Sequence, residues 1–192
     1  SAGRGPLAGP VVAAAVVLKD GARLPGLDDS KLLSEEARVV LVPKIKAQSI
    51  GWAIVQGSVA LIDDINILQA SLWAMREAVE QVWRGIVEVD GLRPQVVLID
   101  GNKTIPKLVM PPQKTIVKGD RRSRAIAAAA VLAKVYRDDL MREMDVAHPG
   151  YGMAQHKGYP TPMHLEALKR LGPTLNHRRS FAPVAAALKA RS

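Results

Sequence analysis

Apolar residues occur along the chain either as short continuous runs or at helical spacing. Residues 11–18 are apolar throughout and stand between Pro10 and the polar pair Lys19-Asp20. A continuous run of this length predicts a β-strand that is buried on both faces. The same reasoning predicts a second buried strand over residues 94–99, and shorter strands are expected over residues 49–55 and 115–117.

Helices are predicted where apolar residues recur every three or four positions. One such stretch begins at residue 34, and the others cover residues 59–84, 123–144, 163–171 and 182–189. The stretch over residues 59–84 is expected to form two helices. Ser34 and Thr161 are suitable N-caps for two of these helices. Pro43 lies inside the first helical pattern and can bend that helix.

The order of strands and helices predicts an α/β fold, and 192 residues suffice for one sizeable core. No Ser/Gly-rich stretch or charge run divides the sequence, so we expect a single domain over residues 1–192. Trp73 and Trp83 are expected in its core. No apolar stretch approaches the ~20 residues of a membrane span, so a membrane is not expected among the partners.

Charge is distributed unevenly between the two halves of the chain. Residues 1–102 contain 10 Lys and Arg against 12 Asp and Glu, whereas residues 103–192 contain 17 against 6. The halves therefore carry −2 and +11, which sum to the formal net charge of +9. A basic half of this size favours a polyanionic partner, although a solvated surface explains it equally well. The lack of cysteine excludes a disulfide framework and a thiolate metal site, and it is compatible with a cytoplasmic location.

Two aspartates stand where predicted elements end or begin. Asp100 closes the strand predicted over residues 94–99, and Asp120 precedes the basic pair Arg121-Arg122 and a predicted helix. Ligand sites of α/β sheets gather at such strand ends. Each aspartate also has a structural explanation, because Asp-Gly is a common turn and Asp is a good helix cap. Taken without further context, the structural explanations are the more frequent ones.

Five segments carry a more specific pattern: Ser1-Ala2-Gly3-Arg4-Gly5-Pro6, Leu98-Ile99-Asp100-Gly101-Asn102, Lys118-Gly119-Asp120, His156-Lys157-Gly158-Tyr159-Pro160-Thr161 and His177-Arg178-Arg179-Ser180-Phe181. Together they resemble the ribonuclease HII family of bacterial type over essentially the whole chain. The resemblance implies an RNase H-like mixed β-sheet flanked by helices, with a C-terminal helical extension. It also implies a monomeric, cytoplasmic endonuclease of DNA replication and repair.

The resemblance makes Asp100 and Asp120 catalytic residues that hold two Mg²⁺ or Mn²⁺ ions. Two such ions can activate a water and stabilise the leaving 3′-oxygen of a phosphodiester. In the family an Asp-Glu pair directly precedes the segment that matches Ala2 and completes a set of four carboxylates, whereas Ser1 occupies the Glu position here. Two carboxylates supply too little negative charge for two cations. We therefore expect the chain as printed to bind metal weakly and to cleave poorly.

Substrate contacts are implied for the turn formed by Gly3, Arg4 and Gly5, which would recognise the ribonucleotide at an RNA–DNA junction. Its glycines let the backbone approach the 2′-hydroxyl, the group that separates RNA from DNA. Tyr159 would pack against the sugar or base pair at the junction. Further substrate-binding residues implied by the matched segments are Lys31 and Asn102.

Several positions depart from the family pattern. The family segment around Lys31 has a second lysine where Leu32 stands, and it commonly has serine at the positions of Ala125 and Ala130.

The remaining polar residues of the matched segments receive structural interpretations. Arg137-Asp138 is interpreted as a structural ion pair or a surface group, and His164 is expected on a helix surface. His156 and His177 predict no transition-metal site, since cysteine and helical i,i+4 pairing are both lacking.

The leading hypothesis is an endonuclease that degrades the RNA of RNA–DNA hybrids and incises duplex DNA 5′ of an embedded ribonucleotide. The alternative is a catalytically disabled RNA–DNA junction-binding protein, which a native Ser1 would favour. The persistence of Asp100 and Asp120 favours instead a printed chain that begins inside the family's first strand. That strand would lie inside the sheet, so a chain without it should be unstable, with a groove in its core and unpaired strand edges.

Overall fold

Two short ladders of strands organise the chain, which a computed structural model describes over residues 1–27, 32–91, 93–109 and 111–192. Strand β1 (Val11–Leu18) pairs antiparallel with β2 (Ser49–Gly57). Strand β3 (Val97–Asp100) pairs parallel with β4 (Gln113–Ile116). The strand predicted over residues 11–18 is confirmed to the residue, and the other three are confirmed with ends shifted by two to three residues.

The helices follow the predicted stretches closely. They are α1 (Glu35–Ala47), α2 (Val59–Ile65), α3 (Ile67–Asp90), α4 (Arg124–Ala147), α5 (Met153–His156), α6 (Pro162–Leu171) and α7 (Ala182–Lys189), with a 3-10 turn, η2 (Gly119–Arg121). Ser34 and Thr161 cap α1 and α6 as predicted, and Pro43 lies inside α1. The division of residues 59–84 occurs at Asn66, whose side chain caps α3 by accepting from the Gln69 N–H at 3.0 Å. The short elements α5 and η2 were not predicted, because one turn of helix leaves no apolar period to detect.

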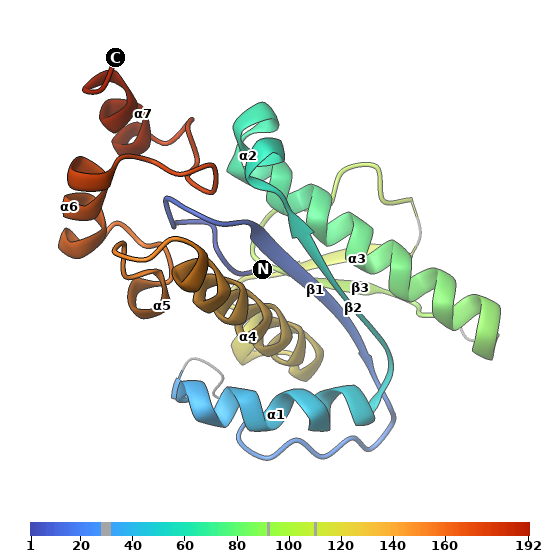
Figure 1. Ribbon diagram of the computed structural model, residues 1–192. Coiled ribbons are helices and arrows are strands. Elements are labelled where there is room, and N and C mark those ends of the chain that lie inside the picture. The colour runs from blue at the N-terminus through green and yellow to red at the C-terminus, as the bar shows by residue number, and fades with distance from the viewer. Residues whose placement is uncertain (28–31, 92, 110) are drawn as a thin grey trace.

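Strand β1 packs against helices on two sides, α1 and α4 on one and α3 on the other (Figure 1). Its first three residues are fully buried as predicted, and residues 14–18 are half-buried. Ala14, Val16 and Leu18 pack against a cluster from α1 and α4 that includes Leu41 and Leu132. Ala15 and Val17 point to the other face and pack against α3. The predicted α/β fold with helices on both faces is therefore confirmed.

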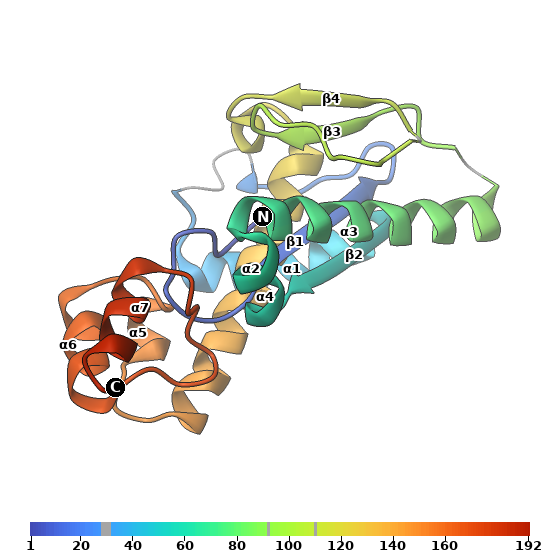
Figure 2. The ribbon, with the colours of Figure 1, turned by 90° about the horizontal axis from the view of Figure 1, so that it is seen from above.

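Helices α5, α6 and α7 gather at one end of the molecule, next to the N-terminal segment (Figure 2). Leu7 packs with Leu168 and Val184, and Ala8 packs with Met141 and Tyr151. The predicted C-terminal helical extension is thus present. This extension packs onto residues 7–8 and therefore helps to position the turn at residues 3–5.

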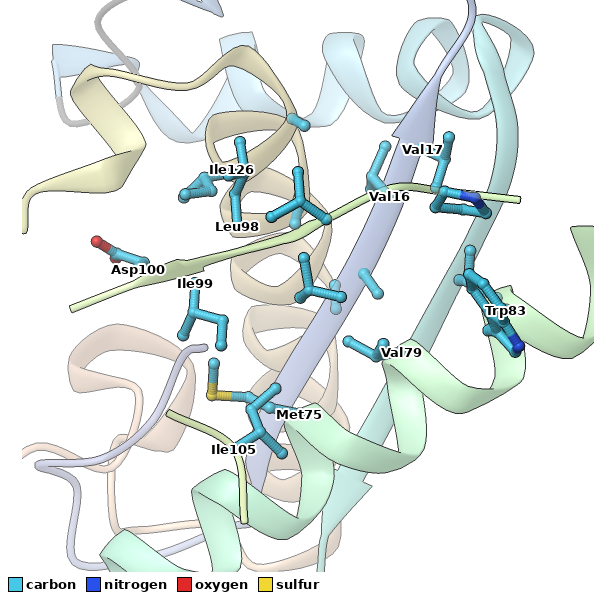
Figure 3. A pocket seen from close by; sticks show the side chains of 18 of the residues that line it. Val16, Val17, Met75, Val79, Trp83, Leu98, Ile99, Asp100, Ile105 and Ile126 are labelled. Carbon is cyan, nitrogen blue, oxygen red and sulfur yellow. The ribbon is translucent and has the colours of Figure 1, made fainter. Parts of the chain in front are cut away.

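An apolar cavity of about 350 Å³ separates the two ladders. Its walls are β1, β3, α3 and α4, and Figure 3 shows the side chains of Val17, Leu98 and Val79 turned toward it. Within the described residues, β1 pairs with β2 and β3 pairs with β4, but β1 and β3 do not pair with each other. The expected continuous mixed sheet is therefore divided into two ladders here.

The cavity explains two errors of the sequence prediction. The strand β3 was expected to be buried, yet Val96 and Leu98 are 44% and 36% exposed, because both line the cavity. Trp83 was expected in the core and is only half-buried at the cavity wall, and Trp73 is half-buried as well. Throughout the described part of the chain, no helix combines the length and apolarity that a membrane crossing requires.

Candidate active site and nucleic-acid groove

The two predicted carboxylates are brought together at the end of β3. Asp100 is the last residue of that strand, and its Oδ1 accepts a hydrogen bond of 2.8 Å from the Gly119 N–H. A Cβ at residue 119 would lie 3.4 Å from Asp100 Cα and 2.7 Å from Ile126 Cδ1, so glycine keeps η2 in close contact with the end of β3 and with α4. The next residue, Asp120, is 7% exposed, whereas Asp100 is exposed.

The amino group of Ser1 is close enough to both carboxylates for their negative charges to act on it. Burial lowers the pKa of this amine, whereas the negative charges of Asp100 and Asp120 raise it and Arg4 lowers it. Ser1 also borders the apolar cavity, which Asp100 lines from the other side. The start of the printed chain therefore lies at the strand end where the carboxylates meet.

A polar groove of about 510 Å³ joins most of the predicted substrate contacts to Asp120. It is lined by the predicted turn Gly3-Arg4-Gly5 and by Tyr159. Its remaining walls include the basic residues Arg38, Lys134 and Arg137 and the small residue Ala130. The groove therefore presents positive charge around a single buried carboxylate, which suits a polyanionic ligand.

Two predicted substrate residues fall outside this arrangement. Asn102 is exposed in the loop after β3 and is not among the residues that line the groove. Lys31 lies outside the described residues. Of the two positions where the family commonly has serine, Ala130 lines both the groove and the cavity, and Ala125 lines the cavity alone.

Arg178 holds the Gly-Arg-Gly turn from inside the protein. Its guanidinium is completely buried and donates hydrogen bonds to the carbonyl oxygens of Gly3 at 2.6 Å, Pro6 at 2.8 Å and Gly9 at 2.9 Å, with a longer one to Arg4 at 3.2 Å. Burial lowers the pKa of Arg178 to about 9. The side chain forms these bonds as a cation, because a buried guanidinium with several acceptors keeps its proton at neutral pH.

Arg137 also binds carbonyl oxygens of the N-terminal segment, at residues that follow the Gly-Arg-Gly turn. It is 1% exposed and donates to the carbonyls of Ala8 at 2.9 Å, Pro10 at 3.0 Å and Lys157 at 2.8 Å. Burial lowers its pKa to about 10. The interpretation of Arg137-Asp138 as an ion pair or surface group was wrong, because Asp138 binds Lys134 at 2.6 Å instead.

Glycine is required where the turn crosses these arginines. Gly3 has a φ of +89°, and a Cβ there would overlap the Arg137 guanidinium. Gly5 faces Tyr159, and a Cβ at residue 5 would lie 3.3 Å from the ring atom Cε1. Since Tyr159 is 43% exposed, one side of its ring is open beside the turn. The turn and the aromatic ring thus form one surface, as the sequence predicted.

The histidines differ from the sequence prediction. His164 was expected on a helix surface, yet it is completely buried, as is His177. Their Nε2 atoms lie 2.9 Å apart, and His156 stacks on His164 with ring centroids 4.4 Å apart. Burial lowers the pKa of His164 and lowers that of His177 to about 4, with the neighbouring histidine charge as a further cause for His177. Neither burial nor pairing of these side chains could be inferred from their spacing.

The donor set for a metal ion consists of Asp100 and Asp120. Across the described ranges of the chain, no three or more acidic, histidine or cysteine side chains lie together as a metal cluster. Mg²⁺ and Mn²⁺ prefer carboxylate oxygens, so the two aspartates suit such ions in kind. They do not suffice in number for a pair of ions.

The sequence and the fold are both similar to those of known proteins. The sequence family described as ribonuclease HII matches residues 1–184. The fold is similar to that of ribonuclease H2 from Pyrococcus horikoshii, with a TM-score of 0.78 and 23% identity over 98% of this chain and 94% of that chain. It is also similar to a PCNA:RNase HII complex from Archaeoglobus fulgidus, with a TM-score of 0.76 and 23% identity over 97% and 93% of the two chains. Bst-RNase HIII in complex with Mn²⁺ gives a TM-score of 0.78 and 17% identity over 98% and 67%.

Replacing Arg178 by lysine should destabilise the protein by about 3 kcal/mol, since one ammonium cannot satisfy the buried carbonyls that the guanidinium now binds. The free energy of unfolding in urea measures this effect. Arg179→Lys is the matched control, because the neighbouring side chain is exposed and should tolerate the change. Equal stability of the two variants would show that the carbonyls do not depend on Arg178.

Acid should weaken the fold before the carboxylates titrate. The pKa of His177 is depressed from 6.5 to about 4, so the unfolded chain takes up this proton first and stability falls as pH drops from about 7 toward 4. At pH 5 the loss due to His177 alone is about 2 kcal/mol. Urea unfolding at pH 7.5 and pH 5 should show a smaller decrease for His177→Gln, which cannot titrate; an identical decrease in both proteins would contradict the assignment.

Proposed function

Because the chain belongs to the ribonuclease HII family and is thus a ribonuclease acting on RNA–DNA hybrids, we propose that it incises duplex DNA on the 5′ side of an embedded ribonucleotide. The observation that carries this proposal is the single groove that joins the turn Gly3-Arg4-Gly5, the Tyr159 ring and Asp120. Such a groove can read a sugar and hold the adjoining phosphate close to a carboxylate.

Recognition of the ribonucleotide falls to the turn and the ring. The turn is fixed by Arg178 through its carbonyl oxygens, so its shape is set before any substrate arrives. Glycines at positions 3 and 5 keep the backbone accessible to a 2′-hydroxyl. Tyr159 stands beside Gly5 with its ring partly exposed, which suits packing against the sugar.

Attraction of the nucleic-acid backbone falls to the basic residues around the groove. Arg4, Arg38 and Lys134 line it together. Charge-assisted hydrogen bonds from such groups to phosphate oxygens are about twice as strong as neutral ones. Binding should therefore weaken as salt rises, for all-DNA and ribonucleotide-containing duplexes alike.

Divalent ions would be held by Asp100 and Asp120, together with carboxylates supplied from the position of Ser1. The closeness of the Ser1 amine to both aspartates supports this assignment, since a Glu at position 1 and an Asp before it would enter the same site. With two carboxylates alone, the printed chain should hold such ions weakly.

The apolar cavity fits a strand joined ahead of Ser1. Ala2 and Val12 form an antiparallel bridge through bonds of 2.7 and 2.9 Å, so residues joined ahead of Ser1 would continue along β1. Ser1 lines the cavity between β1 and β3. A segment in that position would also place its last residues beside Asp100, at the end of β3.

A junction-binding protein without catalytic activity is the second candidate. It is favoured by the lack of a cluster of three or more metal-binding side chains among the described residues, beside the contact between Gly5 and Tyr159. The two candidates predict the same binding and differ in cleavage alone.

Placing Asp-Glu directly before Ala2 should create metal-dependent cleavage of a duplex that carries one ribonucleotide, because the donor set then doubles. The printed chain should give little or no product with Mg²⁺ or Mn²⁺, and an all-DNA duplex should remain intact. Gel analysis of an end-labelled strand measures the rate and the position of the cut. Ordinary turnover by the printed chain, free of contaminating nuclease, would overturn the expected impairment; binding without cleavage by both proteins would favour the second candidate.

Within the version that carries Asp-Glu, Asp100→Asn and Asp120→Asn should each lower cleavage to the level of the blank, since each removes a charged oxygen ligand. Binding of the same duplex without metal should persist. Asp139→Asn is the control, because this exposed carboxylate binds Arg142 at the surface. Undiminished cleavage by either active-site variant would remove that residue from the proposed site.

A further inference from the structure

A chain of hydrogen-bonded side chains runs through the C-terminal helices and ends on the main chain of Tyr159. The Thr174 N–H lies 2.9 Å from Nδ1 of His177, whose Nε2 lies 2.9 Å from Nε2 of His164. Nδ1 of His164 lies 3.0 Å from the carbonyl oxygen of Tyr159. Both imidazoles are completely buried, so the bond between them is shielded from solvent.

The partners at the two ends fix where the protons reside. A main-chain N–H can only donate, so Nδ1 of His177 accepts from Thr174 and the ring carries its proton on Nε2. A carbonyl oxygen can only accept, so His164 carries its proton on Nδ1 and donates it to Tyr159. The Nε2 atoms then meet as donor on His177 and acceptor on His164. Both rings are neutral, and every polar atom between Thr174 and Tyr159 has a partner of the correct kind.

The surroundings of the pair oppose a positive charge. His156 stacks on His164, while Tyr151 and His148 lie near His177. The adjacent Arg178 is itself a buried cation. Burial lowers the pKa of both His164 and His177, in agreement with two neutral rings at physiological pH.

His177 and Arg178 are neighbours in sequence but contact different parts of the proposed recognition surface. Their backbone lies along the N-terminal segment, with an antiparallel bridge between Ala8 and His177 and a bond of 2.8 Å from the Arg178 N–H to the Leu7 carbonyl. Neighbouring side chains of an extended backbone point to opposite sides. Arg178 accordingly reaches the turn at Gly3, whereas His177 reaches His164 and through it Tyr159.

We propose that His177 and His164 are positioning residues that hold Tyr159 at the height of the ribonucleotide sugar, so that discrimination of RNA from DNA depends on a neutral imidazole pair remote from the carboxylates. This role rests on the proposed function, because it assumes that Tyr159 contacts the junction. The pair acts through the Tyr159 carbonyl, which also accepts a bond of 2.8 Å from the Thr161 N–H. Loss of the His164 bond would leave the Tyr159 carbonyl oxygen with the Thr161 N–H as its remaining described donor.

Equilibrium binding of the printed chain to two fluorescent duplexes tests the proposal. One duplex carries a single ribonucleotide, the other is all DNA, and the ratio of the two dissociation constants is the readout. His177→Ala should reduce this ratio roughly tenfold, toward the value of Tyr159→Ala, which corresponds to one lost aromatic contact. His177→Gln should retain most of the ratio, because its side-chain amide can donate to His164. Leu175→Ala is the control, because this neighbouring side chain is 83% exposed and lies outside this chain of bonds.

The proposed function and the positioning role of the histidines would fail with different results. A wild-type protein that binds both duplexes equally overturns the proposed function, and the role of Tyr159 with it. A wild-type protein that discriminates, beside a folded His177→Ala that discriminates as well, overturns the positioning role alone.

The ring protons provide a second test that needs no variant. Long-range ¹H–¹⁵N spectra of the imidazoles should show the proton of His164 on Nδ1 and that of His177 on Nε2 at pH 7.5. His177 should not titrate between pH 7.5 and 5.5, and His164 should titrate below the ordinary pKa of 6.5. The opposite positions of the protons, or titration of either ring near pH 6.5, would overturn the proposal even if the variants fail to fold.

Discussion

Two buried guanidinium groups determine the shape of the N-terminal segment, and the candidate site depends on them. Arg178 and Arg137 bind seven carbonyl oxygens, six of which belong to residues 3–10. A segment so rich in glycine and proline has no regular ladder in which to satisfy its carbonyl groups. Buried carbonyls without donors would be costly, and two planar groups with several N–H donors supply what a strand partner otherwise would. Because both arginines come from the second half of the sequence, the turn acquires its shape only in the folded protein.

The C-terminal helices therefore belong to the site, although they lie apart from β3, the strand that ends at Asp100 (Figure 2). Residues 176–178 lie against the N-terminal segment, and Asp63 of α2 fixes the chain just beyond by accepting from the N–H groups of Arg179 and Ser180. One face of this contact shapes the Gly-Arg-Gly turn, and the other leads through two histidines to Tyr159. Recognition and fold stability thus share the same buried polar groups, which is why changes at Arg178 or His177 should affect both.

The part of the site that contains Asp100 and Asp120 depends on a different contact. The Gly119 N–H donates a hydrogen bond of 2.8 Å to Asp100, which joins the 3-10 turn that contains Asp120 to the end of β3. The cavity next to them has strands on two sides and helices on the others, and Ser1 stands at its edge. A single extended segment joined ahead of Ser1 could fill the cavity with apolar side chains and place carboxylates beside Asp100. The metal site that we propose and a continuous sheet would therefore both depend on residues joined ahead of Ala2.

The sequence by itself determined the elements whose signal is local. The apolar run over residues 11–18, the caps Ser34 and Thr161 and the matched segments were sufficient to predict the α/β fold and the family. Of the residues that line the groove, the matched segments supplied the Gly-Arg-Gly turn, Asp120 and Tyr159, but not Arg38 or Lys134. Only the tertiary structure decided the burial of Arg137, Arg178, His164 and His177, the exposure of Leu98 and the half-buried position of Trp83. A residue type records a chemical capacity, whereas burial and hydrogen-bond partners are set by segments more than a hundred positions away, as for Arg178 and Gly3. No pattern of spacing along the chain contains that information.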